Sequence, residues 1–312
     1  MKGIRVGFII DPIYSLKPHK DTTVLMLEYL QSSNGKNYVA TQDQLFIRNN
    51  IVYANMQEVK INKDLDIWYE LKPAQAIALC ELDMVWMRKD PPVDREYVYT
   101  TYLLDLVKQQ GGKVYNDPKS IRDYNEKLFT LHFPYAPKSI VTTRKKQIQE
   151  FATANTKVVI KSLDSFGGRG VFLLNAGDLN TNCLIEMLTN RGTTQVLVQE
   201  YIEDINITGD QRVLILNGKP IRESLARMPN PNDLRGNIDA GASYRLIELS
   251  DQQYSMCQQL GDAMQQAGIV FAGVDIIGNY CTEINITSPT CVKEINELSG
   301  ANILGELFMA LL

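Results

Sequence analysis

Asp275, Glu283 and Asn285 place oxygen-bearing side chains inside two apolar, strand-like segments near the carboxyl end of the chain. Glu283 and Asn285 are two residues apart, so a strand places them on one face, about 7 Å from each other. Two carboxylates and an amide oxygen suit Mg²⁺, a hard cation that takes one or two carboxylates together with waters and phosphates. A solvated polar face is the alternative. The apolar residues on both segments indicate burial on one side and favour the metal site; they are Val274, Ile276, Ile284 and Ile286.

The loop between the two segments decides whether Asp275 joins the other two side chains. A three-residue loop, Gly278–Tyr280, would pair Asp275 with Glu283 across a hairpin. A strict two-residue turn would send the two carboxylates to opposite faces of the sheet, because side chains alternate along a strand. The metal-site interpretation therefore predicts the three-residue loop.

A glycine-rich loop follows an apolar strand that ends in a lysine. Strand Val158–Lys161 is followed by loop Ser162–Gly170 and then by strand Val171–Leu174. A Walker A loop would need G-K-[S/T] leading into a helix, so this loop is interpreted as a hairpin flap whose amides cover phosphates. A plain turn is the alternative. Lys161 favours the flap, because an ammonium at the end of an apolar strand is costly to bury without an anion.

The segment Val196–Ile202 is an apolar strand that ends in a carboxylate and an aromatic ring, about 39 residues after Lys161. Its backbone amide and carbonyl groups would bind an adenine edge while apolar neighbours sandwich the ring, as in a mostly apolar pocket with a few placed polar groups. An ordinary core strand is the alternative. We keep the segment as a candidate adenine-binding hinge.

Three arginines could bind anionic groups. Arg212 opens one strand, Arg227 ends another, and Arg235 lies in the Pro-, Asn- and Gly-rich loop Met228–Arg245. A loop of this length is a candidate active-site lid, and the guanidinium fork suits carboxylate and phosphate oxygens. A surface charge is the alternative for each arginine. The chain has only two histidines, neither beside a Ser or Cys nucleophile motif, which disfavours a hydrolase triad.

The order of predicted elements indicates an α/β (α+β) fold. The first third alternates strand Ile4–Ile10, a helix near residues 21–31, strand Met84–Met87, a helix near 97–109 and strand Lys113–Tyr115. Asp11-Pro12 follows the first strand where a dinucleotide fingerprint would have G-x-G-x-x-G, so NAD is disfavoured. The rest of the chain predicts a short helix Asn125–Phe133, long strands, a Gln-rich helix near 251–267 and a closing amphipathic helix.

Charge and composition narrow the partners. With 312 residues, of which 45% are hydrophobic and 22% charged, the chain is typical of a globular protein with several substructures. The formal net charge of −4 disfavours nucleic acids and anionic membranes as partners. The sequence has neither an apolar run of the roughly 18 residues that a membrane span needs nor a signal-peptide pattern, which predicts a cytoplasmic protein. Five cysteines without a C-x-x-C pair indicate reduced, buried thiols.

Several motifs recur in a family-like order along the whole chain. They are Arg88–Pro92 (R-K-D-P-P), Asn125–Phe129 (N-E-K-L-F), Val274–Gly278 (V-D-I-I-G) and Thr282–Cys291 (T-E-I-N-I-T-S-P-T-C). In these motifs the chain resembles the bacterial glutathione synthetases of the ATP-grasp superfamily. The resemblance implies a ligase that joins the carboxylate of γ-glutamylcysteine to glycine through an acyl phosphate, giving glutathione, ADP and phosphate. It also implies Mg²⁺, with Mn²⁺ as the alternative ion, and a homotetramer.

The resemblance assigns residues to the nucleotide, the metal and the transferred phosphate. The nucleotide-binding residues are Lys127, Lys161, Ser165, Gly167, Gly168, Gly170, Gln199, Glu200, Tyr201, Ile202 and Asp210. Among them, Lys127 and Lys161 would hold phosphates, residues 165–170 would be a mobile flap, and Asp210 would lie near the ribose. The magnesium ligands are Asp275, Glu283 and Asn285, with Glu283 between two ions. The arginines near the phosphate are Arg212, Arg227 and Arg235.

The expected architecture is an amino-terminal open α/β domain, residues 1–122, followed by a two-lobed ATP-grasp domain, residues 123–202 and 203–312. Candidate substrate-binding residues are Asp11, Arg88, Asn116 and Ser288. Two alternatives stay open: another ATP-grasp carboxylate–amine ligase, such as a D-alanine–D-alanine or glutamate-adding enzyme, and a nucleotide-binding regulator without catalysis. The intact set of metal ligands argues against the regulator.

Overall fold

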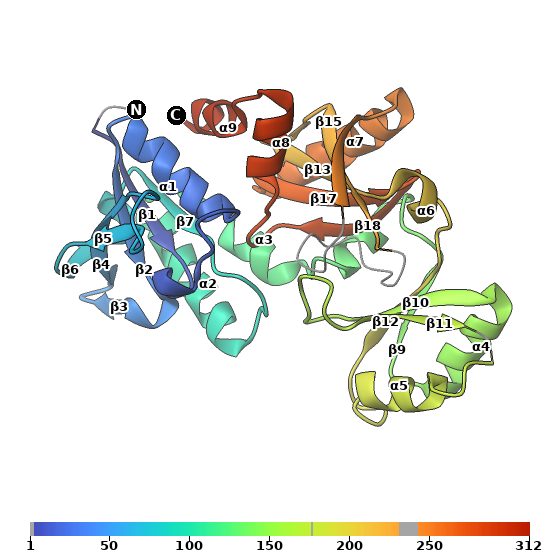
Figure 1. The fold of residues 1–312 in the computed structure, drawn as a ribbon. Coiled ribbons are helices and arrows are strands. Elements are labelled where there is room, and N and C mark those ends of the chain that lie inside the picture. The colour runs from blue at the N-terminus through green and yellow to red at the C-terminus, as the bar shows by residue number, and fades with distance from the viewer. Residues whose placement is uncertain (1–2, 176, 231–242) are drawn as a thin grey trace.

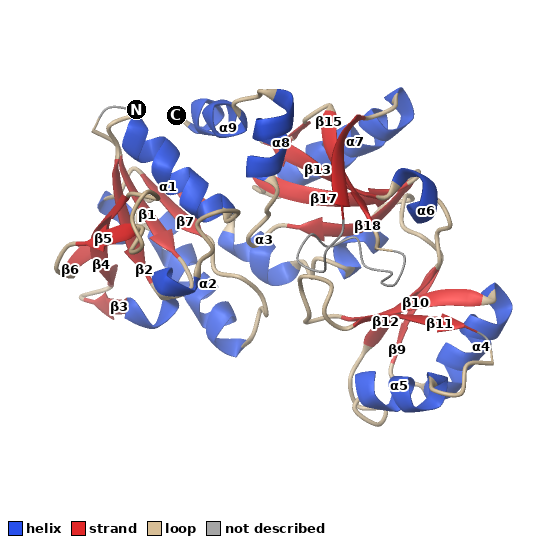
Figure 2. Ribbon diagram, in the orientation of Figure 1, coloured by secondary structure: helices blue, strands red, loops and turns tan. Residues whose placement is uncertain are grey.

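A computed structural model of the chain, which describes residues 3–175, 177–230 and 243–312, contains three β-sheets with helices packed on them (Figures 1 and 2). The helices are α1 Thr22–Ser32, α2 Arg95–Gln109, α3 Pro118–Asp123, α4 Lys145–Asn155, α5 Thr181–Leu188, α6 Ile205–Thr208, α7 Asp251–Gln266, α8 Val292–Ser299 and α9 Ile303–Leu311. Within these described ranges, no helix combines the length and the apolar character needed to cross a bilayer.

The first sheet is formed by the amino-terminal part of the chain, at the left of Figure 1. Its strand order is β3-β4-β2-β1-β7-β8, and β5 and β6 also pair with β4. The strands are β1 Arg5–Ile9, β2 Lys36–Ala40, β3 Leu45–Arg48, β4 Ile51–Ile61, β5 Tyr69–Leu71, β6 Gln75–Ala78, β7 Met84–Met87 and β8 Val114–Tyr115. Strands β2, β1, β7 and β8 are parallel, as the alternation of strands and helices predicted.

Alternate residues of β7 enter two different apolar cores, one on each face of the first sheet. Trp86 faces the core that contains α1, α8 and α9, whereas Val85 faces the core that contains α2. Phe308 of α9 stacks on Tyr29 of α1, with 5.8 Å between the ring centroids, and meets Trp86 edge-on at 6.0 Å. The last helices of the chain therefore pack against its first domain, as Figure 1 shows.

The second sheet is antiparallel and has the strand order β11-β10-β12-β9. Its strands are β9 Ser139–Thr142, β10 Lys157–Ser162, β11 Val171–Asn175 and β12 Val196–Glu200. Helices α4 and α5 cover one face, where Ile160 and Val198 are completely buried. Because side chains alternate, Lys161 and Gln199 point to the other face, which is left for a ligand.

The third sheet has the strand order β16-β15-β13-β17-β18, with β14 paired to β13. Its strands are β13 Asp210–Leu216, β14 Lys219–Pro220, β15 Glu223–Met228, β16 Ser243–Glu248, β17 Phe271–Ile277 and β18 Tyr280–Asn285. Helix α7 buries Leu260 and Met264 against Val213 and Val274 on one face. Arg212 and Asp275, which neighbour these two valines in sequence, therefore point to the opposite face.

Three expectations differ from the structure. The predicted helix Asn125–Phe133 is a shorter 3₁₀ helix, Leu128–His132, and the Asn125 side chain before it accepts hydrogen bonds from the amides of Lys127 and Leu128. The closing helix is two helices, α8 and α9, separated by Gly300 at φ 73°. The predicted loop Met228–Arg245 ends in strand β16, while its residues 231–242 lie outside the described part of the chain.

The five cysteines are all free thiols, as predicted. Cys257, Cys281 and Cys291 are buried. Cys183 is exposed and Cys80 is half-buried, so the prediction of uniformly buried thiols is wrong for these two residues.

Candidate active site

The β17–β18 hairpin brings Asp275 and Glu283 directly opposite each other. The pairing was predicted, but the three-residue loop was not correct, since only Gly278 and Asn279 connect the strands. A bulge restores the register: Asp275 pairs with Glu283 whereas Ile276 pairs with Cys281, which leaves Thr282 as an extra residue. The two carboxylates and Asn285 consequently share one face of the sheet.

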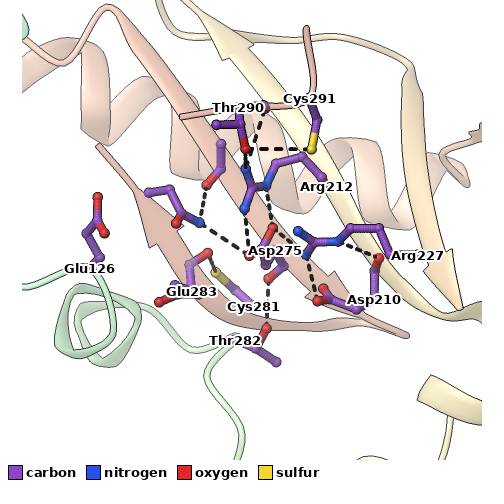
Figure 3. A network of polar contacts seen from close by, with 12 residues as sticks. Glu126, Asp210, Arg212, Arg227, Asp275, Cys281, Thr282, Glu283, Thr290 and Cys291 are labelled. Carbon is purple, nitrogen blue, oxygen red and sulfur yellow. Dashed lines mark hydrogen bonds and ion pairs between the residues drawn. The ribbon is translucent and has the colours of Figure 1, made fainter. Parts of the chain in front are cut away.

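Asp275 lies in a dense network of charged side chains (Figure 3). Arg212 binds both of its carboxylate oxygens, with 3.0 Å between Nη2 and Oδ2, and Arg227 Nη2 lies 2.9 Å from Oδ1. The Asn285 amide donates to Oδ2 at 3.3 Å. Gly273 makes room for this arrangement, because a Cβ there would lie 2.9 Å from the Arg212 side chain. Although burial raises the pKa of Asp275, the two guanidinium groups outweigh burial and bring it to about 2.

Asp210 extends the network toward the second sheet. Its Oδ2 lies 2.6 Å from Arg227 Nη2, while its Oδ1 is buried and has no hydrogen-bond partner among the described residues. Burial raises the pKa of Asp210, and this effect exceeds the opposing effect of Arg227. A buried acceptor without a donor is costly, so Asp210 is suited to accept a hydrogen bond from a ligand hydroxyl.

Two lysines face Glu283 from different elements. Lys127, which is only 3% exposed, lies at 3.1 Å from Glu283 Oε1 and also donates to the carbonyl of Ser165. Lys161 of β10 makes one long contact, 3.4 Å, to the carbonyl of Thr282 at the bulge. Burial lowers the pKa of Lys161, partly offset by Glu283. Both ammonium groups are therefore placed to receive an anion.

Lys127, Lys161, Asp210, Asp275 and Glu283 line a cleft between the second and third sheets. The empty space in this cleft is about 850 Å³, which includes the part that is open to solvent. Its walls are formed by Lys127, Pro137, Val159, Lys161, Ser165, Phe166, Gly167, Gly168, Arg169, Val171, Gln199, Glu200, Tyr201, Ile202, Ile205, Asp210, Asp275, Ile277, Thr282 and Glu283. Apolar residues such as Val159 and Ile202 share this lining with charged ones such as Lys161, which is the usual character of a small-molecule pocket.

The glycine-rich flap and the hinge both border this cleft. Gly167, Gly168 and Gly170 have φ angles of 64°, 74° and 68°, which only glycine adopts at low cost, so their backbone can turn tightly over the cleft. At the hinge, the Glu200 carboxylate accepts from the amide of Lys138 at 3.1 Å. The ring of Tyr201 lies 3.7 Å from the ammonium of Lys157, a cation–π contact.

The side chains of Asp275, Glu283 and Asn285 fit a hard divalent cation, because they offer two carboxylates and an amide oxygen on one face. A carboxylate has about four lone-pair sites, and Arg212, Arg227 and the Asn285 amide supply four donors to Asp275, so a cation would take the place of at least one of them. No three His, Cys, Asp or Glu side chains surround a common metal position in the described chain. The phosphates of a nucleotide would have to complete the coordination, as is usual for Mg²⁺.

Three of the predicted substrate residues lie where the first domain meets the segment after β18, and none of them is among the residues that line the cleft. Asp11 binds Lys89 at 3.1 Å and accepts from the amide of Asp90 at 2.8 Å. Ser288 hydrogen-bonds to Asp90 as well. Arg88 is buried, donates to the carbonyl of Pro289 at 3.0 Å, and its Nη1 has no partner among the described residues.

Asn116, the fourth predicted substrate residue, is occupied by the backbone of the third sheet. Its Oδ1 accepts from the amides of Val270 and Phe271, both at 2.9 Å. Its Nδ2 donates to the carbonyls of Phe271 and Ile286, both at 2.7 Å. Because every polar atom of the side chain is used, Asn116 connects two domains and has no group left for a substrate.

Some of the site was not anticipated from the sequence. No sequence pattern predicted the bulge at Thr282, because a bulge depends on how two strands pair. Val159 and Val171 could have been predicted from the sequence. Val159 lies two residues before Lys161 on the same strand, and Val171 lies directly across from Lys161 on the neighbouring strand, so both share its face of the sheet. Arg235 lies outside the described residues, so the structure leaves its place open.

Comparisons with known proteins agree with this geometry. The family model "Prokaryotic glutathione synthetase, N-terminal domain" matches residues 4–122, and the model for the ATP-grasp domain of the same family matches residues 126–300. The chain is 41% identical to the glutathione synthetase of Coxiella burnetii over 311 residues, covering 99% of this chain and 96% of the relative. It is 40% identical to that of Wigglesworthia glossinidia brevipalpis over 304 residues, covering 97% and 96%.

Solved structures share the fold at low sequence identity. D-cycloserine synthetase DcsG superposes with a TM-score of 0.67 at 12% identity, covering 98% of this chain and all of that one. The ATP-grasp ligase PsnB, in complex with a precursor variant, Mg and ADP, gives a TM-score of 0.64 at 19% identity, covering 98% and 97%. The fold is thus that of an ATP-grasp ligase. From the two family models and the full-length relatives, the chain belongs to the prokaryotic glutathione synthetase family and is an ATP-dependent carbon–nitrogen ligase of glutathione synthesis.

Proposed function

We propose that the cleft between the second and third sheets binds ATP with Mg²⁺ and ligates γ-glutamylcysteine to glycine. The observation that carries the proposal is the convergence of Lys127 and Lys161 on Glu283, opposite Asp275. Asp275, Glu283 and Asn285 would hold the metal. When bound, the divalent ion supplies positive charge that neutralises the nucleotide phosphates and orients them.

Lys127 and Lys161 would pair with the phosphates of ATP. The flap amides from Ser165 to Gly170 would cover those phosphates, and the hinge from Gln199 to Ile202 would receive the adenine. Asp210 would accept a hydrogen bond from a ribose hydroxyl through its Oδ1, a buried atom for which the described residues supply no donor. These assignments are supported by the lining of the cleft, which contains all of these segments.

Arg212 and Arg227 would stabilise negative charge as the dipeptide carboxylate attacks the terminal phosphate. A carboxylate oxygen bonds to the γ-phosphorus as the bond to ADP breaks, which gives an acyl phosphate and ADP. The amine of glycine then attacks the acyl carbon, phosphate leaves, and the nitrogen loses a proton to form the amide. Two anions must meet in the first step, so positive charge and in-line placement matter more than proton transfer. The family resemblance alone assigns Arg235 to the same role, the stabilisation of negative charge during phosphate transfer.

The dipeptide would bind where the first domain meets the segment after β18. Arg88 Nη1 is a buried donor for which the described residues supply no acceptor, which suits a carboxylate, and Asp11 and Asp90 supply negative charge for an ammonium group. Ser288 and Pro289, which follow β18 of the third sheet, contact Asp90 and Arg88 at the same place. A dipeptide with an α-amino and an α-carboxyl group carries both of these charges.

We also propose the division of the chain into residues 1–122, 123–202 and 203–312, each with one of the three sheets. The cleft would then open and close by movement of the middle unit against the last. The homotetramer and the cytoplasmic location stay predictions from the sequence.

Phosphate release tests the proposed reaction. The purified chain is incubated with ATP and Mg²⁺, with γ-glutamylcysteine plus glycine or with either omitted, and phosphate and glutathione are both measured. We expect phosphate and glutathione in equal amounts, only with both substrates, and none when EDTA is present. Stimulation by D-alanine in place of these substrates would point to another ligase and overturn the proposal.

A further inference from the structure

Glu126 is an acidic residue beside the proposed site that the mechanism above does not use. One oxygen of its carboxylate, Oε1, accepts three hydrogen bonds: from the amide of Ile286 at 2.7 Å, and from the amide and hydroxyl of Thr287, both at 2.9 Å. Its own carbonyl accepts from the amide of Ile284 at 2.9 Å. Glu126 therefore holds the end of β18 and the two residues that follow it, through Ile284, Ile286 and Thr287, immediately after Glu283.

The residues on either side of Glu126 reach other parts of the site. Lys127 pairs with Glu283 at 3.1 Å and binds the carbonyl of Ser165 in the flap. Asn125 donates to the carbonyl of Leu163, also in the flap, at 3.0 Å. Figure 3 shows Glu126 on its own segment, near Glu283. The three residues Asn125–Lys127 thus contact both the flap and the end of β18, the strand that carries Glu283 and Asn285.

We propose that Glu126 is a positioning residue that fixes the distance between the Lys127 ammonium and the oxygen ligands of β18. The proposal rests on the proposed function of these groups. The backbones that carry Lys127 and Glu283 are joined by the hydrogen bond from the Ile284 amide to the Glu126 carbonyl. The Glu126 side chain adds a second attachment, because its carboxylate binds the two residues that follow Asn285.

The Glu126 carboxyl group is partly shielded from solvent and lies near that of Glu283. Burial raises its pKa and the nearby Glu283 raises it further, whereas the three hydrogen bonds from Ile286 and Thr287 lower it.

Three variants test the proposal. Glu126→Ala removes the anchor, and Glu126→Gln keeps an Oε1 acceptor for the same donors without the charge. Gln253→Ala is the control, because the Gln253 side chain holds the other end of the same hairpin by donating to the carbonyl of Gly278 at 2.8 Å. Melting temperature, kcat, KM for ATP and calorimetric ADP affinity with and without Mg²⁺ are measured for each.

For Glu126→Ala we expect kcat to fall about 10- to 100-fold and the gain in ADP affinity on adding Mg²⁺ to shrink by about tenfold, as is usual when the support of a metal ligand is lost. Glu126→Gln should restore both values to within about threefold of the parent. Gln253→Ala should lower the melting temperature by as much as Glu126→Ala and leave the magnesium effect unchanged.

Two results would overturn the proposal. One is an unchanged magnesium effect in Glu126→Ala, and the other is an equal loss of that effect in Gln253→Ala, which would indicate general loosening of the hairpin. A separate variant tests the proposed metal site itself. If Glu283→Gln left the gain in ADP affinity on adding Mg²⁺ unchanged, the metal assignment would be wrong, whatever the result for Glu126.

Discussion

The ammonium of Lys127 lies 3.1 Å from the carboxylate of Glu283, and the two residues are carried by a short connector and by the edge strand β18. Both residues line the cleft: the side chain of Glu283 is 25% exposed, whereas that of Lys127 is almost completely buried. A group that is held in place and faces an open cleft is preorganised for a ligand.

Replacing Glu283 with glutamine should nearly abolish turnover. Glu283→Gln removes one of the two carboxylates proposed for the metal, and loss of one preorganised charged group often costs on the order of 10²–10³ in rate. Since the side chain is partly exposed and glutamine has the same shape, the melting temperature should change by only a few degrees. ADP release in a coupled assay provides the measurement.

Glu297→Gln serves as its control, because Glu297 forms a surface ion pair with Lys293 of the same helix, α8, at 3.5 Å. Steady-state ADP release by Glu283→Gln within a few-fold of this control would remove Glu283 from the metal site.

The fold and most of the site follow from local sequence patterns, and the parts that do not are set by contacts across the chain. The alternation in β10 and β12 already places Lys161 and Gln199 away from the apolar core. The pairing of Asp275 with Glu283 was reached through a loop of the wrong length, because a bulge at Thr282 depends on how β18 meets its neighbours. Asn116 was assigned to the substrate, since no local pattern reveals bonds to residues about 150 positions away.

Asp275→Asn should destabilise the protein in a pH-dependent way. The substitution leaves Arg212 and Arg227 without their shared anion, and breaking a buried ion pair typically costs about 3 kcal/mol. The pKa of Asp275 is about 2 in the folded chain, below its ordinary value of 3.8. The stabilisation is therefore complete above pH 3.8 and is lost as the pH falls toward 2.

Urea unfolding at pH 7, 5 and 3 measures this effect. The difference in free energy of unfolding between parent and Asp275→Asn should be the same at pH 7 and 5 and smaller at pH 3. A difference that grows on acidification would contradict the assignment of the charge to Asp275.

Asn116→Ala separates a structural role from a substrate role. The substitution removes four hydrogen bonds and leaves buried backbone groups of β17 without partners, so we expect a loss of about 3 kcal/mol in the free energy of unfolding. The KM for γ-glutamylcysteine, measured below the melting temperature, should stay within about twofold. A variant that keeps its stability but binds the dipeptide poorly would restore Asn116 to the substrate site.

Arg88→Lys tests the substrate site on the first domain. Arginine presents a planar fork, and Nη1 of Arg88 is a buried donor with no partner in the described chain, so a lysine there would lose the second hydrogen bond to a carboxylate. We expect the KM for γ-glutamylcysteine to rise about tenfold, which corresponds to about 1.4 kcal/mol, while the KM for ATP changes by less than about twofold. Arg122→Lys is the matched control, because Arg122 pairs with Asp105 at 2.9 Å elsewhere on the same domain. Equal changes in both KM values, or a similar rise in the control, would show that Arg88 supports the fold without contacting the dipeptide.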